Sequence, residues 1–208
     1  MVPSPIRDFP LFPLGIVALP TESVPLHIFE DRYRRMIELC LEEGREFGIL
    51  WLSDEELKQT GCACEIERVL ERLDGGRLNI LTRGTRPFVL LERQDELPYP
   101  AGAVAFTEDE AEQLDDAAAG ATRELYGELV MQATDRELSA VELAEMDAYR
   151  MAATVEFEPA AKQELLELRS ENARLRRLAE LLASALERLD LVERAQLRAQ
   201  STGKVRFG

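Results

Sequence analysis

The chain contains few of the side chains that most catalytic sites need. Its 208 residues include one histidine, His27, and three lysines. Nucleophilic catalysis needs a base beside the nucleophile, so a triad would depend entirely on His27, and no lysine stands in a recognisable Ser–Lys context. The one Gly-Lys step, Gly203-Lys204, lacks the upstream glycine and the following Ser or Thr of a phosphate-binding loop. We therefore expect no catalytic residue, no cofactor and no enzyme.

Long hydrophobic runs are also absent. A membrane span needs about 20 consecutive apolar residues, and a secretory signal needs a basic start before an uninterrupted apolar region. The most apolar part of the N-terminal region, Phe9–Glu30, is interrupted by four prolines and contains His27 between Leu26 and Ile28. We expect no membrane partner, no targeting signal and, by elimination, a cytoplasmic location. His27 itself is expected to be a hydrogen-bonded structural residue.

Cysteine is too scarce for a disulfide framework. The chain has three cysteines, Cys40, Cys62 and Cys64, and an odd number in a chain of this length favours reduced thiols. Together with His27 they could form a Cys3His zinc site, which needs four ligands. The Cys-x-Cys spacing is uncommon for structural zinc, whereas buried free cysteine is common. We expect no bound metal.

Acidic residues outnumber basic ones, 40 to 25. The formal net charge is −15, and residues 107–150 alone hold 13 acidic and three basic residues. Proteins that bind nucleic acid usually present a basic patch, so we expect no nucleic-acid partner. The acidic run 107–116 lacks the spacing of a calcium loop. We interpret it as a solvated helix start, where the helix dipole favours anions.

The first half of the chain has the composition of a small β-domain. Prolines suit the edges and ends of strands, and the glycines of Asp74-Gly75-Gly76 suit a hairpin turn. One helix is indicated after Asp31, where apolar residues recur at helical spacing from Tyr33 to Leu41. We expect about six strands, in a small barrel or a folded-over sheet, among seven β-rich segments: 9–14, 24–28, 46–52, 62–72, 77–83, 88–91 and 103–106.

The second half, from residue 107, has the composition of helices. We expect helices at about 109–133 and 139–152, a third from Pro159, and a long fourth from an N-cap near Ser170. In the fourth, leucines recur every seven residues from 168 to 189. This heptad pattern fits either a coiled coil or a helix that packs one face on its own bundle. The second interpretation is the commoner one, and the first predicts a weak homodimer through residues 168–192.

One segment of the chain resembles a known family closely. The run FPLFPLGIVALPTESVPLHIFEDRYRRMI resembles the start of the N-terminal, substrate-binding domain of Lon protease. Two later stretches agree with that family, DGGRLNILTRGTRPF and the helical KQELLEL with RLRRLAELL. The chain departs from the family pattern at Thr21 and Asp31, where glycine and proline are frequent. The signature residues are Phe12, Pro13, Leu14, Pro20, Pro25, Leu26, Ile28, Phe29, Glu30, Arg32 and Tyr33.

The resemblance implies both a fold and a role. It implies an α+β fold with a PUA-like β-barrel subdomain, residues 1–106, followed by a helical bundle subdomain, residues 107–208, with a long last helix. It also implies a stand-alone Lon-domain protein, without ATPase and protease modules, that binds unfolded or apolar polypeptide segments or a partner protein. Binding could use a groove or strand addition to a sheet edge. An RNA-binding PUA-like protein and a small-molecule enzyme with an unrecognised site are the alternatives, and the signature residues are expected to be structural.

Overall fold

The computed structural model describes residues 5–54 and 56–202, although the side chains of Glu193 and of residues 196–202 lie outside this description. An α+β fold is observed, as expected, in which strands precede helices and a long helix comes last. The strands are β1 (Ile6–Leu14), β2 (Ser23–Ile28), β3 (Phe47–Leu52), β4 (Leu57–Arg72), β5 (Leu78–Gln94) and β6 (Ala101–Phe106). The helices are α1 (Asp31–Glu43), α2 (Asp116–Thr134), α3 (Ala140–Ala144), α4 (Ala148–Ala152), α5 (Pro159–Glu167) and α6 (Glu171–Thr202).

The strands close into a barrel, to which β2 is added at one side. The sheet has the order β2-β5-β4-β3-β1-β6, and β6 pairs with both β1 and β5. β1 runs parallel to β3, whereas all other pairs are antiparallel. The first half of β5 pairs with β2 and its second half with β6, which is why this strand is so long. The prediction of a separate strand at 88–91 is therefore wrong, because these residues are part of β5.

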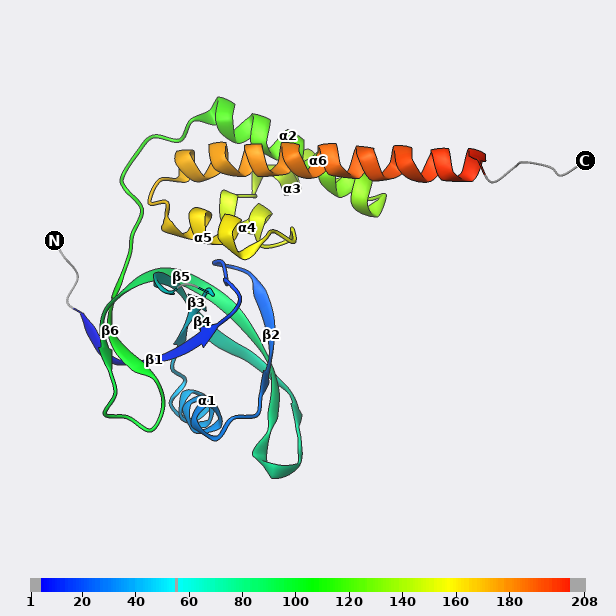
Figure 1. The fold of residues 1–208 in the computed structure, drawn as a ribbon. Coiled ribbons are helices and arrows are strands. Elements are labelled where there is room, and N and C mark those ends of the chain that lie inside the picture. The colour runs from blue at the N-terminus through cyan, green and yellow to red at the C-terminus, as the bar shows by residue number, and fades with distance from the viewer. Residues whose placement is uncertain (1–4, 55, 203–208) are drawn as a thin grey trace, which may run out of the picture. The chain divides into compact units, whose positions relative to one another are not determined.

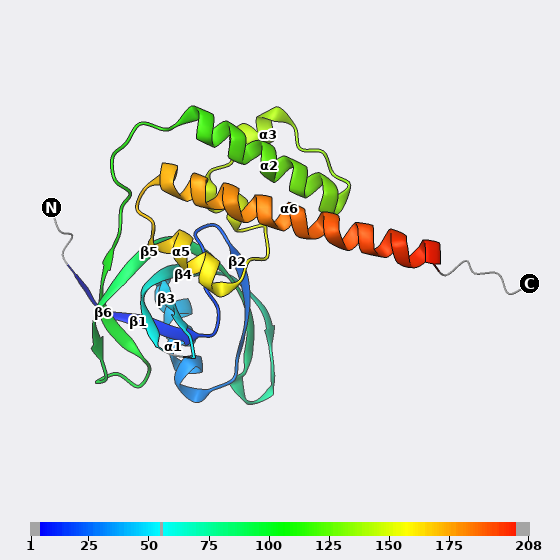
Figure 2. The ribbon, with the colours of Figure 1, turned by 45° about the horizontal axis from the view of Figure 1, so that its top comes forward.

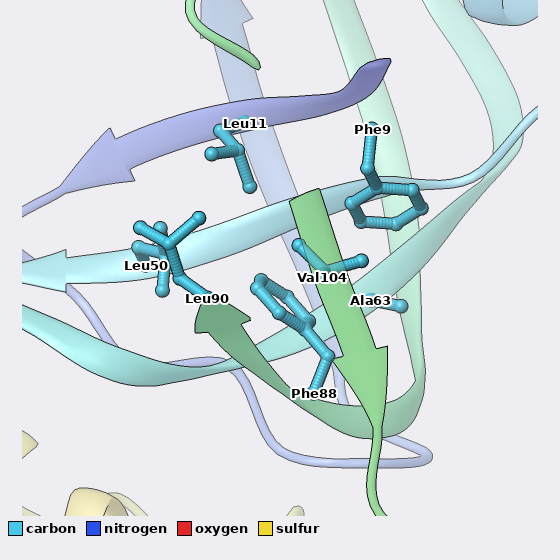
Figure 3. Packing of buried hydrophobic residues seen from close by; sticks show 7 residues of the cluster. All are labelled: Phe9, Leu11, Leu50, Ala63, Phe88, Leu90 and Val104. Atoms are coloured by element: carbon cyan, nitrogen blue, oxygen red, sulfur yellow. The ribbon is translucent and has the colours of Figure 1, made fainter. Parts of the chain in front are cut away.

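The barrel is closed around an aromatic core. Figure 3 shows Phe9 and Phe88 approaching one another from β1 and β5, with aliphatic side chains of the other strands around them. The two rings meet edge to face with their centroids 5.6 Å apart, a favoured aromatic geometry. Two glycines make room for Phe88, because a Cβ at Gly48 would lie 2.5 Å from its ring and one at Gly61 would lie 2.7 Å from it. Other members of the cluster are Leu11, Leu50, Ala63, Leu90 and Val104.

The single helix of the first half begins and ends where the sequence indicates. Asp31 lies in its first turn and Gly44 closes it in the left-handed conformation, at φ 62°. The predicted apolar stripe is buried at Tyr33, Met36, Ile37 and Cys40, and Figures 1 and 2 both place α1 at one end of the barrel. The β4–β5 hairpin is also confirmed, since Gly75 and Gly76 adopt φ angles of 73° and 74°.

The chain forms two compact units that differ from the expected division at residue 107. The first comprises residues 1–112 and 148–171, and the second residues 113–147 and 172–208. Helices α4 and α5 therefore belong to the unit of the barrel. The side-chain amide of Gln163 on α5 donates to the carbonyl of Thr60 on β4 at 3.1 Å, and Lys162 forms an ion pair with Glu22. The division into 1–106 and 107–208 stays a prediction about subdomains.

Two helix predictions are wrong in their bounds. Residues 107–115 are not helical, because the N–H of Glu110 donates to the carbonyl of Arg169 instead of to a helical partner, and Asp115 caps α2 by accepting from Ala118. The helix expected at 139–152 is two short helices, since the Glu171 carboxylate accepts from the N–H of Ala148 and so caps α4 separately. Helix α5 begins at Pro159, as predicted.

In the second unit, α2 runs beside α6, as both Figures 1 and 2 show. The Thr122 hydroxyl on α2 donates to the carbonyl of Leu175 on α6 at 3.1 Å. Leu175 and Leu182 of the heptad series are buried, and Leu189 is 36% exposed. Part of the leucine repeat thus serves packing within the chain, as the second interpretation of the heptads predicted. Among the described residues, no helix combines the length and the apolar character needed to cross a bilayer.

Replacement of Gly48 by alanine tests the aromatic core. We expect Gly48→Ala to lower the free energy of unfolding by about 1–3 kcal/mol, because overpacking displaces the Phe88 ring. Gly15→Ala is the matched control, since nothing lies within 4 Å of a Cβ at that position. Urea unfolding of both variants gives the comparison, and equal midpoints would contradict the role assigned to Gly48.

Candidate functional site

A concave surface opens at one end of the barrel, where β1, β3 and β5 finish and β4 and β6 begin. It has a volume of about 550 Å³ and is called here the barrel-end groove. Seven of the predicted signature residues line it, from β1, from the segment that joins β2 to α1 and from the first turn of α1: Phe12, Pro13, Leu14, Phe29, Glu30, Arg32 and Tyr33. The signature therefore does more than build strands, because it surrounds the cavity.

Of the four other signature residues, Pro20 and Ile28 are buried, and Pro25 and Leu26 of β2 lie at a different surface. They line a second, shallower depression of about 510 Å³ on the outer side of β2, β5 and β4, called here the strand-face depression. His27 lines both surfaces. Among the described residues it is therefore the position at which the barrel-end groove and the strand-face depression meet.

The floor of the barrel-end groove is aromatic. The rings of Phe12 and Tyr33 lie with their centroids 4.1 Å apart, and Phe12 also packs against Phe47 of β3 at 6.4 Å. Burial raises the pKa of the Tyr33 phenol, although the Arg32 guanidinium, 4.5 Å from the ring centroid, acts in the opposite direction. Tyr33 is thus a neutral ring that supports the groove.

The rim of the groove presents apolar side chains to solvent. Phe29 is 58% exposed and Leu52 is 50% exposed. Leu57, at the start of β4, is partly buried and packs against the core cluster. Single exposed apolar residues are ordinary, but several around one concavity mark an interaction surface. This rim makes the barrel-end groove the candidate interaction surface of the first unit.

The charges of the groove are paired with each other. Arg32 donates to Glu30 through Nε at 3.0 Å, and Arg93 lies 3.7 Å from Asp95 across their charged ends. Each guanidinium thus has a neighbouring carboxylate within the groove. The groove is therefore close to neutral in a chain that carries a net charge of −15.

His27 is an exposed residue, and not a residue of the core. Its Nδ1 lies 2.6 Å from Oδ1 of Asn79 on β5, so the expected hydrogen bond is present. Its ring stacks on that of Phe29, with centroids 5.7 Å apart. The structural interpretation of His27 is consequently incomplete, because the side chain faces the rim of the groove.

The sequence did not indicate several residues of the groove. Leu52, Leu57, Arg93, Asp95 and Pro100 come from the ends of three other strands and their connections. Nothing in their local sequence marks them, because only the closure of the barrel brings these strand ends together.

The cysteines are buried apart from His27, on α1 and β4. Across residues 5–54 and 56–202, no group of three or more His, Cys, Asp or Glu side chains could hold a metal ion. Burial raises the pKa of Cys40 to about 11 and holds that of Cys62 well above its ordinary value. These thiols are consequently poor nucleophiles and poor ligands at neutral pH.

Comparison with known proteins identifies a family model that covers most of the chain. The model of the "ATP-dependent protease La (LON) substrate-binding domain" matches residues 8–184. A curated Lon protease from Methylocella silvestris is 29% identical over 198 residues, which is 90% of this chain and 24% of the relative. The chain therefore spans about a quarter of the length of that relative.

Two solved structures have the same fold. A Lon N-terminal domain protein from Xanthomonas campestris is 26% identical, with a TM-score of 0.63, covering 86% of this chain and 98% of the other. The N-terminal domain of a Lon protease from the Mycobacterium avium complex is 20% identical, with a TM-score of 0.69, covering 85% and 98%. The second likeness concerns the fold alone.

The buried thiols predict a loss of stability in alkali. A thiol whose pKa is raised by folding stays protonated in the native state, while the unfolded chain ionises above its ordinary value of 9.0. The contribution of the protonated Cys40 thiol to the free energy of unfolding is therefore complete below pH 9.0. It is lost as the pH rises towards about 11. Urea midpoints should fall over this range, and the fall should be shallower in Cys40→Ala. An unchanged slope would show that this thiol is not shielded.

Proposed function

Because the chain belongs to the family of ATP-dependent protease La (LON) substrate-binding domains, we propose that it is a non-catalytic module that binds unfolded or apolar polypeptide segments. The family supports a substrate-binding role, and the barrel-end groove is the surface proposed for it. The single observation that carries the proposal is that seven signature residues line a largely apolar concavity with Phe29 at its rim.

The chemistry of the groove suits a polypeptide better than a polyanion. Its floor and rim are aromatic and aliphatic, and its arginines, Arg32 and Arg93, stand beside carboxylates that compete with any phosphate. Apolar side chains of an unfolded segment would leave water and pack against Phe29, Leu52 and Leu57. Each Å² of apolar surface buried in this way contributes about 25 cal/mol to the free energy of binding. A near-neutral groove also discriminates little between segments of different charge. This suits a module that binds segments of varied sequence.

The proposed link to proteolysis is one of recognition and not of cleavage. The curated relative from Methylocella silvestris is a Lon protease, and on this basis we place the binding of unfolded segments within protein quality control. The purified chain should bind reduced, carboxymethylated lactalbumin, a permanently unfolded protein, and leave it intact on prolonged incubation. Fragmentation of the lactalbumin would contradict the non-catalytic role.

Replacement of Phe29 by serine tests the groove. We expect Phe29→Ser to weaken binding of carboxymethylated lactalbumin about tenfold, because burial of a phenylalanine contributes roughly 1.5–3 kcal/mol. Leu91→Ser is the matched control, since Leu91 is 55% exposed on the same barrel and lines neither the groove nor the depression. Fluorescence anisotropy with labelled lactalbumin gives both affinities. Equal losses in the two variants, or no loss in Phe29→Ser, would reject the groove as the binding surface.

Self-association through residues 168–192 is a separate proposal. Apolar side chains remain exposed near the end of this range, with Leu191 at 64% and Val192 at 54%. We expect a weak homodimer that light scattering detects only at high concentration and that Leu191→Glu abolishes. Gln132→Glu, which adds the same charge at an exposed position of α2, should leave the dimer intact. A wild-type chain that is monomeric at every concentration would contradict the proposal.

A further inference from the structure

A series of hydrogen bonds crosses the outer face of the sheet and ends at the barrel-end groove. On β5, Nδ2 of Asn79 donates to Oε2 of Glu71 on β4 at 2.9 Å. On its other side, Oδ1 of Asn79 lies 2.6 Å from Nδ1 of His27 on β2. The strand registers place these residues directly opposite one another, His27 beside Asn79 and Asn79 beside Glu71.

This series determines which nitrogen of His27 carries the proton. A carboxylate only accepts hydrogen bonds, so Asn79 must turn its amide nitrogen towards Glu71 and its oxygen towards His27. An amide oxygen also only accepts, so Nδ1 of His27 must be the donor. In the neutral imidazole, Nε2 then remains an unprotonated acceptor. Among the described residues, no hydrogen bond reaches Nε2.

The residue that carries this acceptor lies between two surfaces, each of which exposes an apolar side chain. On one side, His27 stacks on Phe29 at the rim of the barrel-end groove. On the other, it borders the strand-face depression, where Leu70 is 48% exposed. A polypeptide that used both surfaces would therefore pass beside His27, the residue that lines both.

We propose that Nε2 of His27 accepts a main-chain N–H from an extended apolar segment that lies across it, with one apolar side chain in the barrel-end groove and another against Leu70. The inference rests on the proposed function and specifies how the occupant is held. A main-chain donor is present at almost every residue of an extended segment, so this contact requires no particular side chain. Asn79 and Glu71 are positioning residues that hold the imidazole in the tautomer that accepts.

Peptides with a single ester bond test the main-chain contact. Short overlapping peptides of lactalbumin are first screened for binding, and the strongest is resynthesised with one amide at a time replaced by an ester, which removes one N–H. We expect one position to lose about fivefold in affinity, the contribution of one hydrogen bond. In His27→Phe, which keeps an aromatic ring on Phe29 but has no acceptor, the same ester should cost nothing further.

The single histidine of the chain permits a direct test of its tautomer. In mildly alkaline buffer, nitrogen NMR of the imidazole should show Nδ1 protonated and Nε2 unprotonated, and the peptide should shift the Nε2 signal. Asn79→Leu should lose this tautomer preference together with the ester effect. Glu71→Gln should keep both, because an amide oxygen can still accept from Asn79.

The outcomes separate this inference from the proposed function. If Phe29→Ser weakens binding while His27→Phe binds as the wild type does, the groove is the site and the His27 contact is wrong. An ester penalty that is equal in His27→Phe and the wild type, or a proton on Nε2 in the wild type, would also overturn it. If neither substitution affects binding, the barrel-end groove is not the binding surface. If the wild-type chain does not bind lactalbumin, the proposed function itself fails.

Discussion

Closure of the barrel around Phe88 is the constraint on which the rest of the first unit depends. β6 must pair with both β1 and β5, and this is possible only if the interior is filled without gaps and without strain. Because Gly48 and Gly61 have no side chain, the Phe88 ring can occupy the centre of the barrel. The Phe9 ring packs against it edge to face. Interiors packed to this density tolerate little change in volume.

The groove is a consequence of the same closure. When the sheet closes, the ends of β1, β3 and β5 and the starts of β4 and β6 meet around one opening, and the segment leading into α1 borders it. Phe12 shows how structure and site are joined, because its ring packs against Phe47 inside the unit and supports Tyr33 beneath the groove. A residue can thus belong to a fold signature and to a binding surface at once.

The sequence predicted the kinds of elements better than the surface they create. Proline positions, the stripe from Tyr33 to Cys40 and the Asp74–Gly76 turn each act through local geometry, so these strands, this helix and this hairpin were predictable. Contacts between distant segments were not. The helix expected from about residue 109 starts only at Asp116, because Arg169 takes the hydrogen bond of Glu110. Likewise, Arg93 and Leu57 reach the groove through strand pairing, for which local sequence carries no signal.

The interleaving of the two units affects the order in which the protein can form on the ribosome. The chain leaves the first unit after residue 112, returns to it at 148 and leaves it again after 171. During synthesis the barrel therefore emerges long before Gln163 and Lys162, the residues that satisfy the Thr60 carbonyl and neutralise Glu22. Until α5 has been made, a nascent barrel lacks the hydrogen bond from Gln163 to the Thr60 carbonyl on β4 and the ion pair of Lys162 with Glu22 before β2. Completion of the first unit must thus await the synthesis of a large part of the second.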